Sequence, residues 1–135
     1  MLKECLCFQL GNLSKYISKH YREKIVQFDL THAQFFMLMA IIEFEGYTQT
    51  QLADHTSSDR TTTTGLIDRL ERDGWVERHS DPEDRRILRI FLSPKGKKHR
   101  KKLQNIFFEV NGAFQDRFSL VEWNQFQKFL NKLSA

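Results

Sequence analysis

Apolar residues recur every three or four positions along most of this chain, which is the spacing of amphipathic helices. Several helix starts carry a capping box, in which a Ser or Thr and a Glu or Gln three residues later satisfy each other's free backbone N–H groups. The boxes are Thr31/Gln34, Thr48/Gln51 and Ser119/Glu122. Ser93-Pro94 marks a further start, because proline at the first helical position needs no N–H. With Gly46 and Gly74, which suit left-handed helix ends, these signals predict helices over residues 4–27, 32–45, 49–55, 59–73, 94–115 and 120–133.

The period changes to two between Gly74 and Ser93. Residues 88–92 alternate between aliphatic side chains on one face and Arg or Phe on the other, the pattern of a strand with one buried face. The aliphatic face is Leu88, Ile90 and Leu92. Residues 75–79 supply the partner strand, and Asp81-Pro82 begins the turn between them. The sequence therefore predicts a mainly α fold with one small β-hairpin.

The helix predicted over residues 59–73 has a polar face of short side chains. Its buried stripe is Thr63, Leu66, Ile67 and Leu70. Thr61–Thr64 disfavour a helix, because β-branching restricts the side-chain rotamers. A DNA-contacting surface would explain them, since hydroxyls bond phosphates and base edges while methyl groups contact thymine. Gly65 would let the backbone approach a duplex, and Arg60 could bind guanine or a phosphate. The alternative is a surface helix that merely tolerates threonine.

The tip of the hairpin, residues 81–86, raises two adjacent arginines away from the body. Narrow minor grooves attract inserted arginine, and Asp84 is placed to orient a neighbouring guanidinium through a charge-assisted bond. A solvated turn is the alternative, but this tip lies one hairpin downstream of the threonine-rich helix. A helix suited to the major groove beside a basic hairpin is a winged helix-turn-helix. The predicted DNA contacts are Ser58, Arg60, Thr61, Thr62, Thr64, Gly65, Arg69, Asp84, Arg85 and Arg86.

The distribution of charge favours a polyanionic partner on one part of the chain. Residues 60–102 hold 13 Lys or Arg and 7 Asp or Glu, a balance of +6, whereas the rest has a balance of −2 and the whole chain +4. Solvated helix faces would give similar counts, so charge alone does not decide. The basic run over residues 95–102 is interpreted as a solvated face near the DNA.

Length and composition exclude several other classes. At 135 residues the chain is expected to form a single domain. No apolar run approaches the ~20 residues that cross a bilayer, and no signal-peptide core is present, so we expect a cytoplasmic protein without membrane contact. Cys5 and Cys7 are too close together to frame a disulfide fold. No histidine pairs at i,i+4, and no phosphate-binding glycine loop or nucleophile–base pair is readable, so we expect no metal, no cofactor and no enzymatic activity.

Several runs of residues together resemble the MarR family of bacterial transcriptional regulators. These runs are 30–34, Leu52-Ala53-Asp54, 59–76, 81–86 and 92–96. The resemblance implies a homodimer in which residues 1–30 and 100–135 form dimerisation helices and residues 31–99 form a winged helix-turn-helix lobe. It also implies a pseudopalindromic operator and, usually, repression relieved by a small molecule or by oxidation. By position, Arg86 matches the family's minor-groove arginine and Asp84 its supporting aspartate. Thr63 and Gly65 depart from the family, which commonly has an aliphatic and a larger polar residue there.

The two ends of the chain support dimerisation independently, because they carry more large apolar side chains than one small lobe can cover. The set near the start is Leu6, Leu10, Leu13, Ile17 and Tyr21. The set near the end is Val110, Phe114, Phe118, Val121, Trp123, Phe126, Phe129, Leu130 and Leu133. The alternative is that they close the core of a monomer.

Two kinds of signal remain open. Cys7 with Tyr21 resembles the organic-hydroperoxide-sensing branch of the family, although two further tyrosines of that pattern fall on Gly11 and His32 here. A reactive cysteine needs a stabilised thiolate, and a structural cysteine is the alternative. Otherwise a small aromatic or anionic inducer could bind between the dimer helices and the lobe. The candidate pocket residues are Tyr16, His20, Tyr21, His32 and Phe36.

The sequence therefore favours a homodimeric regulator, expected to be a repressor, that binds specific double-stranded DNA. The competing hypothesis is a winged-helix module that docks another protein without specific DNA binding.

Overall fold

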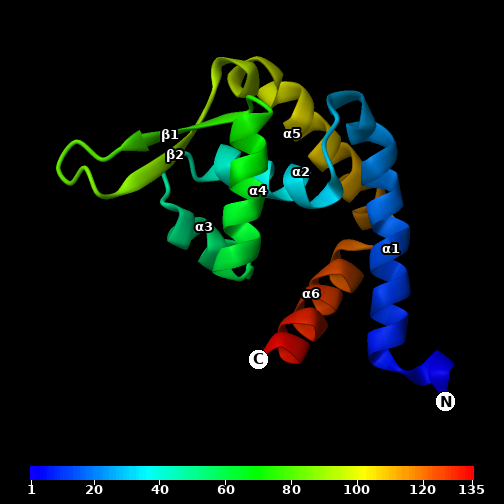
Figure 1. Cartoon of the computed structure of the whole chain (residues 1–135). Coiled ribbons are helices and arrows are strands. Elements are labelled where there is room, and N and C mark those ends of the chain that lie inside the picture. Colours follow the sequence, from blue (N-terminus) through cyan, green and yellow to red (C-terminus); the bar gives the residue numbers. More distant parts are fainter.

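The computed structural model describes residues 1–135 and contains six α-helices and one antiparallel hairpin (Figure 1). The helices are α1 (Leu6–Ile25), α2 (His32–Glu43), α3 (Gln49–His55), α4 (Arg60–Arg72), α5 (Pro94–Gln115) and α6 (Leu120–Ser134). The strands are β1 (Val76–Ser80) and β2 (Leu88–Leu92), and short 3-10 turns, Leu2–Glu4 and Val26–Phe28, flank α1. The predicted mainly helical fold with a hairpin is confirmed, and all three predicted capping boxes are formed.

The elements divide into a lobe and an arm. The helices α2, α3 and α4 and the hairpin gather on one side, α5 runs across them, and α1 and α6 extend away with both chain ends (Figure 1). The arm helices face each other across a groove that both line. No helix taken singly combines the length and apolar composition of a bilayer crossing, and only α1 and α2 satisfy those criteria as a pair, bent by 79°.

One apolar core joins the lobe to the start of the arm. Its buried side chains come from all of α1 to α5 and from the hairpin, with Trp75 just before β1. They include Ile25, Phe35, Leu38, Leu52, Ile67, Leu70, Trp75, Ile90 and Leu103. The predicted buried stripe of α4 is confirmed, with Thr63 fully buried beside its three aliphatic partners. Burial of each large aliphatic side chain contributes about 1.5–3 kcal/mol. The orientation of α4 is therefore set by its buried face, which leaves the opposite face to solvent.

The hairpin is anchored on one side by a third extended segment. Residues pair in the register Val76↔Leu92 to Ser80↔Leu88. The Ile90 N–H donates to the Tyr47 carbonyl at 2.9 Å, the Gly46 N–H donates to the Ile90 carbonyl at 2.8 Å, and Thr48 forms a bridge with Arg89. The sequence did not predict this third edge, because so short an extended segment has no readable period.

The predicted inward face of β2 is wrong at one residue. Ile90 and Leu92 are buried, but the Leu88 side chain is 47% exposed. Leu88 pairs with Ser80 at the outer end of the ladder, where the hairpin projects beyond the lobe and has no core to contact. Alternation along a strand predicts which residues lie on the same face, but it does not predict how far the core extends beneath that face.

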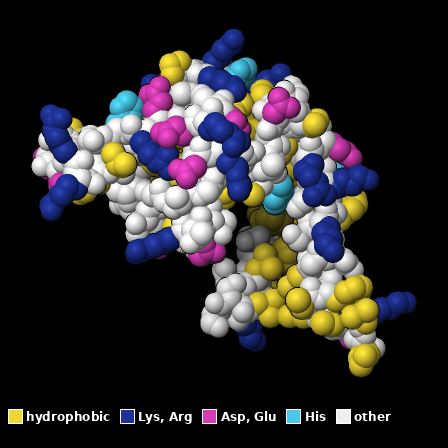
Figure 2. All heavy atoms as spheres, in the orientation of Figure 1, with side chains coloured by type: hydrophobic (Ala, Val, Ile, Leu, Met, Phe, Trp, Pro, Cys, Tyr) yellow, Lys and Arg dark blue, Asp and Glu magenta, His cyan; other side chains and the backbone are white.

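The terminal apolar stripes divide into two groups. Tyr21 and Val110 are buried in the core of a single chain, and Ile17 and Phe114 pack against it, so the prediction that they await a partner is wrong for these four. The others lie farther along the arm, where apolar side chains cover much of the visible surface (Figure 2). Those left exposed are Leu6, Leu10, Leu13, Phe118, Val121, Phe129 and Leu133.

Candidate nucleic-acid interface

A short turn joins α3 to α4 and holds the start of α4 at the surface. Ser57 has a φ of +52°, in the left-handed region, and Asp59 caps α4. The Asp59 carboxylate accepts from the Thr62 N–H at 2.6 Å and from the Thr62 hydroxyl at 2.9 Å. These two bonds, the backbone one first, hold the pKa of Asp59 below its ordinary value. The result is a helix-turn-helix whose second helix, α4, has a capped first turn.

The four consecutive threonines of α4 use their hydroxyls differently. Thr63 and Thr64 donate to the backbone carbonyls of Asp59 and Arg60 at 2.9 and 2.8 Å, and Thr62 donates to the cap. Thr61 alone makes no side-chain hydrogen bond within the chain and is exposed. Only Thr61 therefore keeps a hydroxyl free to donate to DNA, while Thr62 and Thr64 can accept a bond or present a methyl group.

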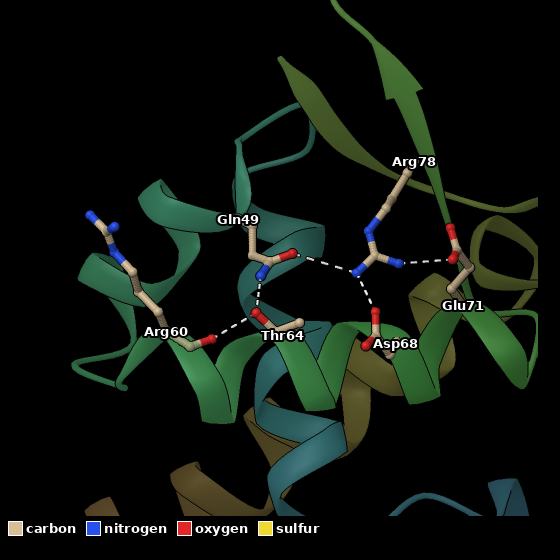
Figure 3. Close-up of polar contacts among 6 residues, drawn as sticks. All are labelled: Gln49, Arg60, Thr64, Asp68, Glu71 and Arg78. Atoms are coloured by element: carbon tan, nitrogen blue, oxygen red, sulfur yellow. Dashed lines mark hydrogen bonds and ion pairs between the residues drawn. The ribbon is translucent and has the colours of Figure 1, made fainter. Parts of the chain in front are cut away.

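The remaining predicted contacts of this helix-turn-helix lie on one accessible surface. Arg60, Thr61, Thr62 and Arg69 are exposed, while Ser58, Thr64 and Gly65 are half-buried. The Arg60 guanidinium points away from the polar network that its carbonyl joins (Figure 3). Gly65 has an ordinary helical backbone, and an added Cβ would meet only the Arg69 Nη2 at 3.9 Å. The fold itself therefore does not require glycine at residue 65.

Gly65→Ala is expected to stabilise the fold while weakening DNA binding. Alanine is favoured over glycine in a helix interior by about 0.8–1 kcal/mol, but its methyl group would stand on the surface that approaches the duplex. Chemical unfolding and DNA titration would measure the two effects. Gly112→Ala is the matched control, since a Cβ there meets no atom within 4 Å and the residue lies in α5. Equal DNA affinity for wild type and Gly65→Ala would exclude close approach at residue 65.

The tip of the hairpin presents one arginine in a fixed orientation. Arg86 donates to Asp84 from Nε at 3.0 Å and from Nη2 at 2.9 Å, and its backbone N–H donates to the same carboxylate at 3.1 Å. These bonds, the side-chain ones first, lower the pKa of Asp84, and the same side-chain pairing raises the pKa of Arg86. The Arg86 side chain is nevertheless 90% exposed. Arg85 is also exposed but makes no side-chain bond within the chain.

A second aspartate fastens the tip to the lobe. Asp81 accepts from the Arg89 Nε at 2.6 Å and from the Glu83 N–H at 2.8 Å, and Arg89 also donates to the Gly46 carbonyl at 3.1 Å. The bond from Arg89 is the largest cause of the lowered pKa of Asp81. The projecting hairpin is thus tied back to the segment before α3.

Sequence reasoning missed Arg78, which joins the hairpin to both helices of the helix-turn-helix. Its guanidinium donates to Asp68 at 2.6 Å, to Glu71 at 2.8 Å and to Gln49 at 3.4 Å (Figure 3). In the sequence it stands in a charged strand and resembles a solvated residue. The only available signal was its strand position, two residues after the buried Val76 and therefore on the same face.

The predicted pocket residues separate into two clusters. Tyr21, His32 and Phe36 line the groove of about 470 Å³ between α1, α2 and α6. Tyr16 and His20 instead form edge-to-face contacts with Phe114 on another side of α1, with ring centroids at 5.9 and 5.1 Å, so the five predicted residues do not all line one groove of the single chain. Helical spacing places Tyr16 and His20 on one side of α1, but it does not reveal that Phe114 of α5 packs against that side.

The groove holds two perturbed groups. Burial raises the pKa of Tyr21. Burial, and then the nearby positive charge of Arg22, lowers the pKa of His32, whose Nε2 lies 3.1 Å from the Ser18 hydroxyl. Aromatic and aliphatic side chains make up most of the lining of this groove.

The candidate redox pair does not meet within one chain. Cys7 is exposed near the start of α1, and Tyr21 follows 14 residues later on the same unbroken helix. At about 1.5 Å per residue, the two lie roughly 21 Å apart along the helix axis. A bond between them would require a second copy of the chain. No group of three or more His, Cys, Asp or Glu side chains is placed to share a metal ion.

The accessible face of α4, its capped turn and the arginine-tipped hairpin define a winged helix-turn-helix protein of the DNA-binding class. The MarR family model matches residues 30–88. The regulator SarZ of Staphylococcus saprophyticus is 34% identical over 135 residues, which cover 97% of this chain and 91% of that protein. The chain therefore belongs to the MarR family, which consists of transcription factors rather than enzymes, so the expectation of a non-enzymatic DNA-binding regulator is confirmed.

Solved structures agree over nearly the whole chain. The S. aureus MepR–DNA complex superposes with a TM-score of 0.87 and 25% identity, covering 96% of each chain. Overoxidized AbfR bound to DNA superposes with a TM-score of 0.74 and 26% identity, covering 96% of this chain and 90% of that one. Both superpositions cover 96% of this chain and therefore include the arm as well as the lobe.

Proposed function

We propose that the protein acts as a homodimeric repressor that binds a pseudopalindromic operator. The proposal rests on two features that occur together: α4 has an exposed polar face, and Asp84 holds the exposed Arg86 guanidinium in place by two hydrogen bonds. The face of α4 would enter a major groove, while Arg86 would reach the adjacent minor groove. Two similar proteins, MepR and AbfR, have been solved bound to DNA, which supports this arrangement.

The dimer would form through the arm. Seven of the large apolar side chains predicted to form the dimer stripes stay exposed in a single chain, and contiguous apolar patches of this kind mark interaction sites. Two copies joined there would present two α4 helices to successive major grooves, which is how two-fold proteins read two-fold operators. A monomer would have only one such contact.

The proposed signal is a small aromatic molecule in the groove lined by Tyr21, His32 and Phe36. The groove lies between the arm and α2, so an occupant could change the angle between the arm and the lobe. Oxidation of Cys7 is the second candidate, because the residue is exposed and a partner chain could bring a tyrosine to it.

Footprinting on the DNA upstream of the protein's own gene tests the proposal. We expect a protected two-fold site, and loss of protection when a small aromatic acid or an organic peroxide is added. Release by peroxide that disappears in Cys7→Ser would assign the signal to that cysteine. Absence of any protected site at low salt would contradict operator binding.

Arg85→Ala is expected to weaken binding to all DNA sequences by a similar factor. Arg85 has no internal partner and is free to neutralise a phosphate, so its loss should reduce the slope of log affinity against log salt by about 1 for each contact removed. Titrations of operator and unrelated DNA at several salt concentrations measure both effects. A loss of affinity that depends on the DNA sequence, with an unchanged salt slope, would indicate that Arg85 contacts a base instead.

A further inference from the structure

Arg78 is the point at which the wing meets both helices of the helix-turn-helix. The residue lies on β1, and only 17% of its side chain is exposed. One terminal nitrogen donates to Asp68 and Gln49, and the other donates to Glu71 (Figure 3). A single guanidinium therefore connects β1 to α3, through Gln49, and to α4, through the two carboxylates.

The strand register explains why this side chain faces the lobe. Arg78 pairs directly with Ile90, and directly opposed residues point to the same face of a hairpin. Ile90 is only 1% exposed. The next residue of β1 on this face, Ser80, is exposed and is the last residue of the strand. Arg78 is thus the last inward-facing side chain of β1 before the wing leaves the lobe.

The contacts of Arg78 continue into the surface that faces DNA. The Gln49 amide, which accepts from Arg78, donates to the Thr64 hydroxyl, and Thr64 in turn donates to the Arg60 carbonyl (Figure 3). Both Asp68 and Glu71 lie on α4 itself. A movement of the wing base would therefore break bonds to the recognition helix.

We propose that Arg78 is a positioning residue that fixes the wing at the angle at which Arg86 and α4 contact DNA together. This inference rests on the proposed operator binding. The planar guanidinium can satisfy three acceptors at once, which a lysine ammonium on a flexible stem does not reproduce in the same geometry. Without it, backbone bonds to residues 46 and 47, Arg89 and the buried Ile90 and Leu92 still attach the hairpin, but no polar side chain joins it to α3 or α4. DNA binding would then have to order the wing.

A double-mutant cycle between Arg78 and Arg86 tests the coupling. In the wild-type background we expect Arg86→Ala to weaken operator binding by about 5- to 150-fold. In the Arg78→Met background the same change should cost less than about 3-fold, because the wing no longer holds Arg86 in the groove. Arg72→Met is the matched control, since Arg72 ends α4, is 69% exposed and pairs only with its neighbour Asp73. An equal loss on Arg86→Ala in all three backgrounds would overturn the proposal.

A variant in which Arg78 and its two carboxylate partners are all uncharged distinguishes an effect of charge from an effect of wing position. Arg78→Met leaves two unpaired carboxylates on α4. These would repel DNA whatever the orientation of the wing. The triple variant Arg78→Met/Asp68→Asn/Glu71→Gln removes all three charges. We expect the contribution of Arg86 to stay reduced in this variant. Full recovery of that contribution would show that repulsion caused the loss and would refute positioning.

Hydrogen exchange gives a readout that does not depend on DNA. In Arg78→Met, backbone amides of the hairpin should exchange faster than in Arg72→Met, while amides of α2 keep their protection. Unchanged hairpin exchange would contradict the proposal even if DNA affinity fell. If Arg78→Met fails to fold, Gln49→Ala removes the contact of Arg78 with α3, together with the Gln49–Thr64 bond, and leaves the two carboxylate contacts in place. The same faster hairpin exchange is expected. Failure of the wild-type protein to bind any DNA would instead reject the proposed function and leave this comparison intact.

Discussion

Arg86→Ala is expected to weaken operator binding by about 5- to 150-fold with no loss of folding. The Arg86 side chain contacts only Asp84 within the chain and is 90% exposed, so the fold does not depend on it. Its two-bond pairing with Asp84 holds the guanidinium outward before DNA arrives, which lowers the entropic cost of inserting it. Titration against operator DNA and thermal unfolding would measure binding and stability separately.

Two variants distinguish an arginine in a groove from a positive charge near DNA. Arg86→Lys keeps the charge but loses the planar two-bond pairing with Asp84, and should lose most of the affinity that alanine loses. Asp84→Asn keeps Arg86 but removes the charged partner that orients it, and should give an intermediate loss. If Arg86→Lys bound as wild type, general electrostatic attraction would account for the effect. Unchanged DNA affinity in Arg86→Ala would show that the wing does not contact the DNA through this residue.

Disrupting the arm should have the largest effect on DNA binding. Phe129 and Leu133 lie on one side of α6 and are 64% and 55% exposed, so a single chain does not need them for its core. Phe129→Asp/Leu133→Asp would place four carboxylates in a dimer interface, where uncompensated charge is strongly unfavourable. We expect a monomer that binds the operator about 10²- to 10⁴-fold more weakly, because the second half-site is no longer tethered to the first.

Light scattering coupled to gel filtration and operator titration would test this expectation. The matched control is Asn124→Asp/Asn131→Asp, which adds the same charge to exposed positions on the other side of α6, at ~100° per residue. It should remain dimeric and lose little affinity. A wild-type protein that is monomeric at the concentrations that bind DNA would contradict the proposed assembly. So would a Phe129→Asp/Leu133→Asp variant that stays dimeric.

The helices were predictable because their signals are local. A capping box needs only two residues three positions apart, and the three predicted boxes form as expected. The buried stripe of α4 followed from helical spacing, including Thr63, whose hydroxyl is satisfied by the Asp59 carbonyl. Local rules failed where the core ends, as at Leu88, because the extent of a core is set by elements distant in sequence.

The polar parts of the candidate interface were only partly predictable. The Asp84–Arg86 pairing joins residues two positions apart, so the sequence suggested it. The roles of the threonine hydroxyls were not readable, since Thr64 is engaged by Gln49, 15 residues earlier in the chain. The separation of Tyr16 and His20 from the groove depends on how α5 packs against α1, and on Phe114 in particular.

By itself, the sequence determined the helices, the hairpin, the outward face of α4 and the arginines at the wing tip, since each follows from neighbours within a few residues. Only the tertiary structure decided that Arg78 ties the wing to α3 and α4, because its partners lie up to 29 residues away and meet it only once the lobe has packed. It also decided which terminal apolar residues a single chain buries and which it leaves exposed. Burial is a property of the assembled core, and spacing along one helix cannot measure it.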